Sequence, residues 1–169
     1  MTDTTTPDLS HIRGIVLDVD GVLTDGKIVY SDGGKELKQF HVQDGGSIKL
    51  LLQQGIQVAI ITRRQSSIVV RRAKELGINF VAQGAESKSK ALEQLIGEGF
   101  PTSDLIAVGD DLQDLDLFNA AAVSVSVTVP NGHPFVIEQA DWVTARYGGE
   151  GVVAEIAQTL LRVQNRWPF

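Results

Sequence analysis

Three aspartates of this 169-residue chain lie where runs of apolar residues end. Asp18 and Asp20 lie at the end of "GIVLDV" (14–19), and Asp110 follows "LIAVG" (105–109). Side chains two residues apart on an extended segment point the same way, so Asp18 and Asp20 can face one cavity. Carboxylates this close are tolerated when a cation or a shared proton offsets their charge, and with Asp110 nearby the fitting cation is Mg²⁺, which prefers such oxygen ligands. The sequence therefore predicts a magnesium site.

The same cluster predicts phosphoryl chemistry. A carboxylate beside Mg²⁺ can attack phosphorus and form an aspartyl-phosphate. Asp20 can then protonate the leaving oxygen and later activate water. The phosphoryl oxygens need donors, which we expect from the Thr62 hydroxyl, the Lys88 ammonium and the backbone N–H groups near Gly21. Glycine at position 21 also allows the backbone to approach a phosphate closely.

These residues are far apart in the sequence, so a fold must bring them together. Short runs rich in Val and Ile alternate with stretches of helical spacing, which predicts a parallel α/β sheet with right-handed crossovers. The expected strands are 14–19, 58–62, 78–82, 105–109 and 123–127, and the expected helices are 45–55, 65–77, 87–99, 111–121 and 148–164. In such sheets ligands bind beyond the carboxyl ends of the strands, where the candidate side chains fall.

One insertion interrupts this alternation. Residues 27–42 form two short strand-like runs joined by Ser-Asp-Gly-Gly, which predicts a β-hairpin that flanks or covers the site. The chain length favours a single domain over residues 1–169, with a core of about 12–165 and no cap domain. Because one subunit would then leave the site open, we expect a homo-oligomer. The apolar C-terminal residues Trp167 and Phe169 are expected either to be disordered or to reach a neighbouring site.

Composition excludes several other functions. The net charge is −6 and basic residues do not cluster, which argues against nucleic acid as a partner. No apolar run approaches the length of a membrane span, and the opening residues are polar, so a cytoplasmic location is expected. The chain has no cysteine, which excludes disulfides and thiolate metal sites. His11, His41 and His133 show no ligand spacing.

Taken in order, the motifs resemble those of the haloacid dehalogenase superfamily of phosphohydrolases. The four segments are "DVDGVLTDG" from Asp18, "IIT" ending at Thr62, Lys88, and "GDDLQD" (109–114). The chain is most similar to the capless 3-deoxy-D-manno-octulosonate 8-phosphate (KDO 8-phosphate) phosphatase family, over about Gly14 to Ile156. That resemblance implies a three-layer Rossmann-like fold and a Mg²⁺-dependent phosphatase of lipopolysaccharide precursor synthesis. It also implies a homotetramer in which the hairpins form a collar and neighbouring subunits close the site.

The resemblance also assigns roles to residues. It makes Asp18 the nucleophile and Asp20 the acid/base, and it gives phosphate binding to Gly21, Thr62 and Lys88. The implied metal ligands are Asp18, the main-chain carbonyl of Asp20, and Asp110, with support from Asp111 and Asp114. Asp25 is left as a residue that fixes the entry to the hairpin, and Asp116 as a first-turn acid favoured by the helix dipole.

Two residues depart from the family pattern. Arg63 stands where a glycine is usual, and Glu150 stands where an arginine is common. Because a related phosphatase for nine-carbon keto-sugar acids can carry glutamate there, that substrate remains an alternative. A noncatalytic oligomerisation domain and a receiver-like phosphoacceptor are further alternatives. Both are disfavoured, since every catalytic position is filled and both DxD carboxylates lie on the first strand.

Overall fold

The computed structural model describes residues 7–169, which fold around one six-stranded parallel sheet. The strand order is β5-β4-β1-β6-β7-β8, so β1 lies in the middle between β4 and β6. The strands are β1 (Gly14–Leu17), β4 (Gln57–Ile61), β5 (Phe80–Ala82), β6 (Leu105–Val108), β7 (Val123–Thr128) and β8 (Trp142–Val143). This parallel arrangement confirms the α/β fold class expected from the sequence.

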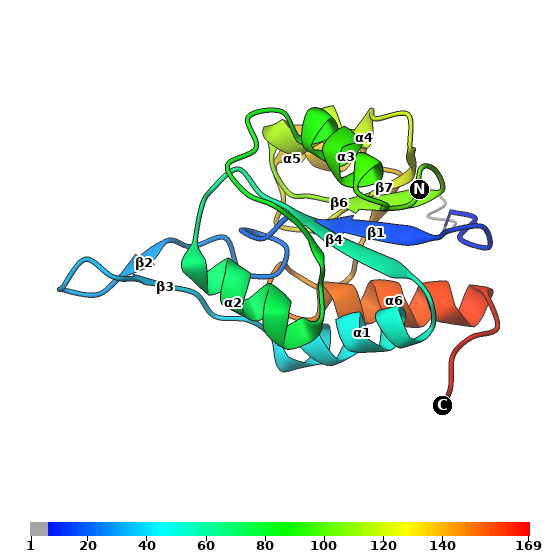
Figure 1. Cartoon of the computed structure of the whole chain (residues 1–169), viewed down its shortest axis with the longest axis horizontal. Helices are drawn as coiled ribbons and strands as arrows, with labels where there is room; N and C mark the ends of the chain where they lie inside the picture. Colours follow the sequence, from blue (N-terminus) through cyan, green and yellow to red (C-terminus); the bar gives the residue numbers. More distant parts are fainter. Residues whose placement is uncertain (1–6) are drawn as a thin grey trace.

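Helices cover both faces of the sheet, giving three layers (Figure 1). One face carries α1 (Val42–Gln53), α2 (Ser67–Leu76) and α6 (Val152–Val163), and the other carries α3 (Lys88–Gly97), α4 (Leu115–Phe118) and α5 (Pro134–Gln139). Successive β1 side chains point to opposite faces, so Ile15 and Leu17 join one buried apolar cluster while Val16 joins the other. All four β1 residues are buried, which explains the apolar run before Asp18.

Some elements differ from those expected. The predicted helix 111–121 is instead a short 3₁₀ turn, Leu112–Asp114, followed by α4, and Asp111 caps the turn. Helix α1 begins three residues earlier than predicted, since His41 already has extended N-cap geometry. Neither β8 nor α5 was predicted, because a two-residue strand and a six-residue helix are too short to show a period.

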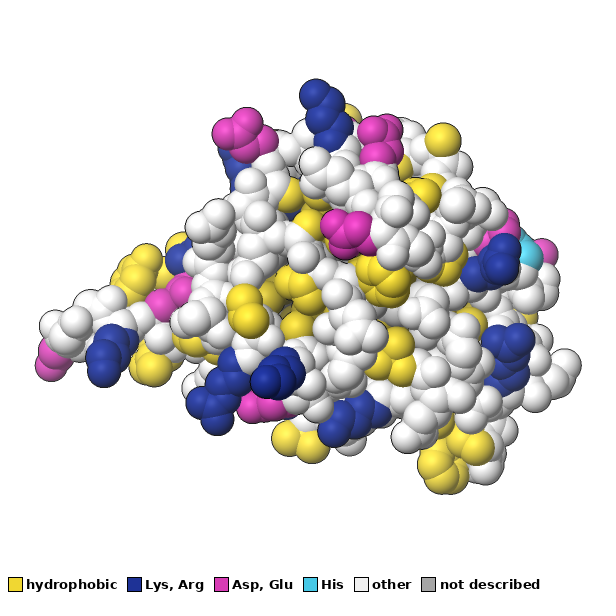
Figure 2. Space-filling model, in the orientation of Figure 1, with side chains coloured by type: hydrophobic (Ala, Val, Ile, Leu, Met, Phe, Trp, Pro, Cys, Tyr) yellow, Lys and Arg dark blue, Asp and Glu magenta, His cyan; other side chains and the backbone are white. Residues whose placement is uncertain are grey.

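The segment between β1 and α1 contains the expected hairpin. Strands β2 (Val29–Tyr30) and β3 (Glu36–Leu37) pair antiparallel and extend away from the body of the molecule (Figure 1). The hairpin bears exposed apolar side chains (Figure 2). The exposed residues are Ile28, Val29, Tyr30 and Leu37, at 55%, 45%, 62% and 52% of their full area.

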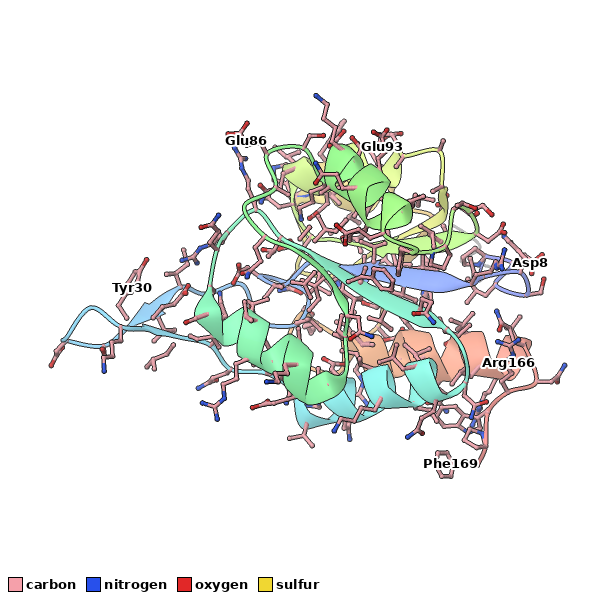
Figure 3. All side chains as sticks on the ribbon, viewed as in Figure 1. Asp8, Tyr30, Glu86, Glu93, Arg166 and Phe169 are labelled. Carbon is pink, nitrogen blue, oxygen red and sulfur yellow. The ribbon has the colours of Figure 1, made fainter. Side chains whose placement is uncertain are left out.

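The C-terminal segment folds back beside α1 and α6. Trp167 packs partly against the core, with the guanidinium of Arg162 over its ring. The Arg166 guanidinium donates to the main-chain carbonyl of Gln54, while Phe169 stays 90% exposed (Figure 3). Among residues 7–169, no helix combines the length and apolar character that crossing a membrane requires.

Candidate active site

The predicted site residues converge at the carboxyl edge of the sheet. Asp18 directly follows β1, Thr62 follows β4, and Asp110 comes two residues after β6. Lys88 is the first residue of α3, and the neighbouring Ser87 accepts the N–H of Lys90 and caps the helix. A cleft of about 150 Å³ at this edge is lined by Asp18, Asp20, Gly26, Thr62, Arg63, Arg64, Asp110, Asp111 and Gln113. Parallel strands thus bring four separate segments to one place.

Lys88 lies between two buried carboxylates. Its ammonium is 3.1 Å from Oδ1 of Asp18 and also contacts Oδ1 of Asp114. The other oxygen of Asp114 accepts the backbone N–H groups of Asp110 and Asp111, at 2.9 and 3.0 Å. Asp114 therefore has partners on both oxygens, and it fixes the lysine and the turn after β6 together. The structure thus gives Asp114 a positioning role.

Asp110 has a different environment. Its Oδ1 is buried without a hydrogen-bond partner, and its carboxylate lies in a cluster with those of Asp18 and Asp114, whose ligand atoms are within 4.8 Å of one another. A buried carboxylate oxygen without a partner is costly unless a cation or donor satisfies it. The cluster therefore fits a hard divalent cation such as Mg²⁺.

Only glycine fits at position 21, beside this cluster of carboxylates. Its φ is +93°, and a Cβ built there would lie 1.9 Å from Oδ2 of Asp110. Its N–H donates to the hydroxyl of Thr24 at 3.3 Å, and the same hydroxyl accepts the N–H of Gly26. The Thr24 hydroxyl thus links the backbone at Gly21 and Gly26 and stabilises the loop after β1. This contact was not predicted from the sequence.

Burial shifts the pKa values of these groups in the metal-free protein. Burial, and then the charge of Asp114, raise the pKa of Asp18 to about 7 against the opposing effect of Lys88. Burial and the charges of Asp18, Asp114 and Asp111 raise the pKa of Asp110 to about 7. Burial acts to lower the pKa of Lys88, but Asp18 and Asp114 outweigh it, so the pKa is raised and the ammonium persists. A bound cation would favour the ionised carboxylates.

Mg²⁺ binding is therefore expected to weaken as the pH falls through 7. The metal binds ionised carboxylates, and below about pH 7 protons compete for Asp18 and Asp110. Each proton released on binding should change the apparent Kd about tenfold per pH unit, and the Kd should level off above pH 7. Calorimetric titration with MgCl₂ between pH 6 and 8, in buffers of different ionisation enthalpy, measures the Kd and the number of protons released on binding. A Kd independent of pH over this range would contradict the expectation.

A turn that contains Gly148 and Gly149 packs directly on the loop of residues 21–25, which follows β1. A Cβ at Gly148 would lie 1.9 Å from the carbonyl oxygen of Gly21, and one at Gly149 would lie 2.6 Å from the backbone nitrogen of Asp25. The N–H of Gly149 donates to the carbonyl of Val22 at 2.9 Å. The carboxylate of Glu155 accepts N–H groups at the start of this turn, so α6 holds the turn in place.

The hairpin adjoins the site, as the sequence predicted, and it also contributes a charged side chain that the sequence did not reveal. The ammonium of Lys38, whose side chain is 3% exposed, forms an ion pair with Oδ1 of Asp20. The same ammonium is 3.4 Å from Glu36, and Glu36 in turn pairs with Arg64 at 2.7 Å. No spacing rule links Lys38 to Asp20, because the contact depends on how the hairpin returns to the sheet.

The remaining candidate residues, Asp25, Asp116 and Asp111, contact neighbouring side chains or the backbone. Asp25 pairs with Lys27 at 3.0 Å at the entry to the hairpin. Asp116 lies in the first turn of α4, yet its carboxylate accepts hydrogen bonds from Ser87 and Ser89 on either side of Lys88. Asp111 lines the cleft and accepts the N–H of Leu112. Among the described side chains, the carboxylate cluster includes none of the three histidines.

The chain is similar to known haloacid dehalogenase-like hydrolases. The model of the haloacid dehalogenase-like hydrolase family matches residues 78–156. The 3-deoxy-D-manno-octulosonate 8-phosphate phosphatase of Escherichia coli strain K12 is 41% identical over 157 residues, which are 92% of this chain and 82% of that protein.

Two solved structures of similar proteins are described as containing metal. The 3-deoxy-D-manno-octulosonate 8-phosphate phosphatase of Moraxella catarrhalis, in complex with magnesium, phosphate and KDO, has a TM-score of 0.88 and 41% identity, covering 95% of this chain and 91% of that one. The cobalt-bound deoxy-D-mannose-octulosonate 8-phosphate phosphatase of Haemophilus influenzae has a TM-score of 0.86 and 36% identity, covering 94% and 92%.

Proposed function

This chain belongs to the 3-deoxy-D-manno-octulosonate 8-phosphate phosphatase family of haloacid dehalogenase-like hydrolases, and on that premise we propose how its residues carry out the reaction. The enzyme is a Mg²⁺-dependent phosphatase that hydrolyses KDO 8-phosphate to KDO and phosphate. The observation that carries the assignment of roles is the position of Asp18, beside Lys88 and the unpartnered oxygen of Asp110, at the carboxyl edge of the sheet.

In the first half-reaction Asp18 is the nucleophile. A carboxylate oxygen of Asp18 forms a bond to phosphorus, the ester bond between phosphorus and the sugar oxygen breaks, and Asp20 gives its proton to that oxygen. Thr62, Lys88 and the backbone near Gly21 donate to the phosphoryl oxygens. Lys88 is 2% exposed and already in contact with Asp18, so its charge lies beside the reacting carboxylate.

In the second half-reaction Asp20 accepts a proton from water. The oxygen of that water bonds to phosphorus, the bond between phosphorus and Asp18 breaks, and phosphate leaves with the carboxylate restored. Asp18, Asp110 and the main-chain carbonyl of Asp20 would hold Mg²⁺, with Asp111 and Asp114 in support. The bound metal supplies positive charge to the phosphoryl group and to the acidic cluster.

Substrate preference is tested by comparing phosphate release from KDO 8-phosphate, nine-carbon keto-acid phosphates and simple sugar phosphates. We expect kcat/KM to be highest for KDO 8-phosphate with Mg²⁺, and activity to disappear with a chelator. A higher kcat/KM for the nine-carbon substrates would instead assign the enzyme to that class. Arg63 on the cleft wall and the exposed Glu150 would then be the residues to exchange first.

We propose that the enzyme is a homotetramer in which the hairpins of neighbouring subunits meet and close the site. The support is the row of exposed apolar residues on a hairpin that extends from the body (Figure 2). We also propose that residues 1–169 form one domain, with a core of about 12–165. The cytoplasmic location stays a prediction.

Charges placed on the hairpin are expected to dissociate the oligomer. Val29 and Leu37 face each other across the two strands, so the double variant Val29→Glu, Leu37→Glu puts like charges on one face. Sedimentation velocity should show a monomer, with kcat/KM for KDO 8-phosphate reduced at least about tenfold because the site is open. Val163→Glu, at an exposed residue of α6, is the matched control and should leave the oligomeric state and kcat/KM unchanged. A monomeric double variant with full activity and selectivity would contradict the shared-site proposal.

A further inference from the structure

Lys38 is a buried cation that the reaction scheme above does not use. It follows β3, at the point where the hairpin returns toward α1, and its side chain is 3% exposed. A lysine is almost never this buried unless its charge is paired. Here the partners are Oδ1 of Asp20 and, at 3.4 Å, Oε1 of Glu36.

Glu36 anchors Lys38 from the other side. Its carboxylate also pairs with the guanidinium of Arg64 at 2.7 Å, and Arg64 lies on the loop that follows β4 and Thr62. The alternating charges of Asp20, Lys38, Glu36 and Arg64 thus join the loop after β1, the hairpin and the loop after β4. Because two elements hold the lysine, its ammonium has one position relative to the sheet.

The contact also determines where Asp20 lies. Asp20 shares its cleft with Asp18 and Asp110, and repulsion among these carboxylates would drive the more exposed Asp20 side chain away from the cleft. The Lys38 ammonium offsets this repulsion from the hairpin side. It pairs with Oδ1, so Oδ2 is the oxygen that can face a substrate.

We infer that Lys38 is a positioning residue, which holds the Asp20 side chain where its protonated form can deliver a proton to the leaving oxygen and its ionised form can then accept one from water. Of the described residues, those that line the cleft include Asp20 but not Lys38, so the lysine acts through the aspartate. The inference rests on the proposed acid/base role of Asp20. It makes the hairpin part of the catalytic apparatus as well as a surface for neighbouring subunits.

The test compares leaving groups in Lys38→Met, which keeps the length of the side chain without its charge. The parameter kcat/KM reports formation of the phospho-enzyme, and p-nitrophenolate leaves without protonation whereas the KDO alkoxide and phenolate need a proton. We expect kcat/KM for KDO 8-phosphate to fall about 100-fold, kcat/KM for phenyl phosphate to fall about tenfold, and kcat/KM for p-nitrophenyl phosphate to change less than about threefold. A merely structural role would lower all three equally, and that result would overturn the inference.

Further variants distinguish loss of the Lys38 charge from a general effect on the hairpin or on folding. Lys38→Arg should restore kcat/KM for KDO 8-phosphate to within about fivefold of the wild type, because it restores the charge. Lys27→Met removes an exposed hairpin lysine that also pairs with an aspartate, and should change none of the three values. Circular dichroism and the Tm verify folding of each variant.

Asp20→Asn tests the premise on which the inference rests. It should show the same dependence on leaving group more strongly, and adding Lys38→Met to it should cause no further loss. If Asp20→Asn lowers all three substrates equally, the proposed role of Asp20 fails. If Asp20→Asn behaves as expected but Lys38→Met does not, only the role of Lys38 fails.

Discussion

Asp18→Asn is expected to lower kcat for KDO 8-phosphate by roughly 10⁴-fold or more, because it removes the proposed nucleophile and leaves no second route to the phospho-enzyme. The amide has the shape of the carboxylate, so it can fill the same 4% exposed position after β1. Measurement of phosphate release with saturating Mg²⁺ gives the loss in kcat. Mass spectrometry of acid-quenched enzyme should show a phosphorylated peptide containing residue 18 in the wild type and none in the variant.

Asp25→Asn is the matched control for this experiment. Asp25 lies on the same loop but is exposed and paired with Lys27, so its variant should retain turnover within about threefold. Turnover by Asp18→Asn at a substantial fraction of the wild-type rate would contradict covalent catalysis. Phosphate would then have to be transferred directly to water.

Lys88→Met is expected to have the largest effect on stability. The lysine is buried between Asp18 and Asp114, and removing one partner of a buried ion pair costs about 3–5 kcal/mol in the free energy of unfolding. Without the ammonium, the pKa of Asp18 should rise beyond its value of about 7, since one of the effects that lower it is gone. The loss in free energy of unfolding should therefore be greatest above pH 7. It should shrink toward pH 5, where the protonated Asp18 carboxyl needs no cation.

Urea unfolding of the metal-free protein at pH 5 and pH 8 measures this difference. Lys90→Met, two residues further along α3 and exposed, should change the free energy of unfolding by less than about 0.5 kcal/mol. Adding Asp114→Asn to Lys88→Met should recover part of the lost stability, because it removes one uncompensated carboxylate. Equal stability of Lys88→Met and wild type at pH 8 would show that the ion pairs contribute little.

Much of this site could be predicted because it depends on a regular fold. Buried strands alternating with helices require a parallel sheet, and residues that follow the strands must then meet at one edge. That logic placed Asp18, Thr62 and Asp110 together, and the start of a helix placed Lys88 beside them. The predicted boundaries failed at α4, whose four residues span little more than one helical turn, and at the start of α1.

The supporting contacts could not be predicted, because they depend on tertiary structure. Lys38 is one of several lysines in the hairpin segment, and only the path of the chain brings it to Asp20. Asp114 had been expected to support the metal shell, but its partners also include Lys88 and two backbone N–H groups that the sequence does not identify. Side chains that hold other side chains leave no periodic pattern.

The contact between the turn at Gly148 and Gly149 and the loop after β1 has a consequence for the order in which the protein is synthesised. Gly148 and Gly149 contact the backbone of residues 21–25, so the loop that carries Asp20 is supported by residues more than 120 positions later. During translation the N-terminal part of a chain emerges first. Asp18 and Asp20 are therefore synthesised early, whereas the turn that supports their loop, and α6, which packs on α1 and holds that turn, follow only later. A chain that ended before residue 148 would keep the aspartates but lose these supporting contacts.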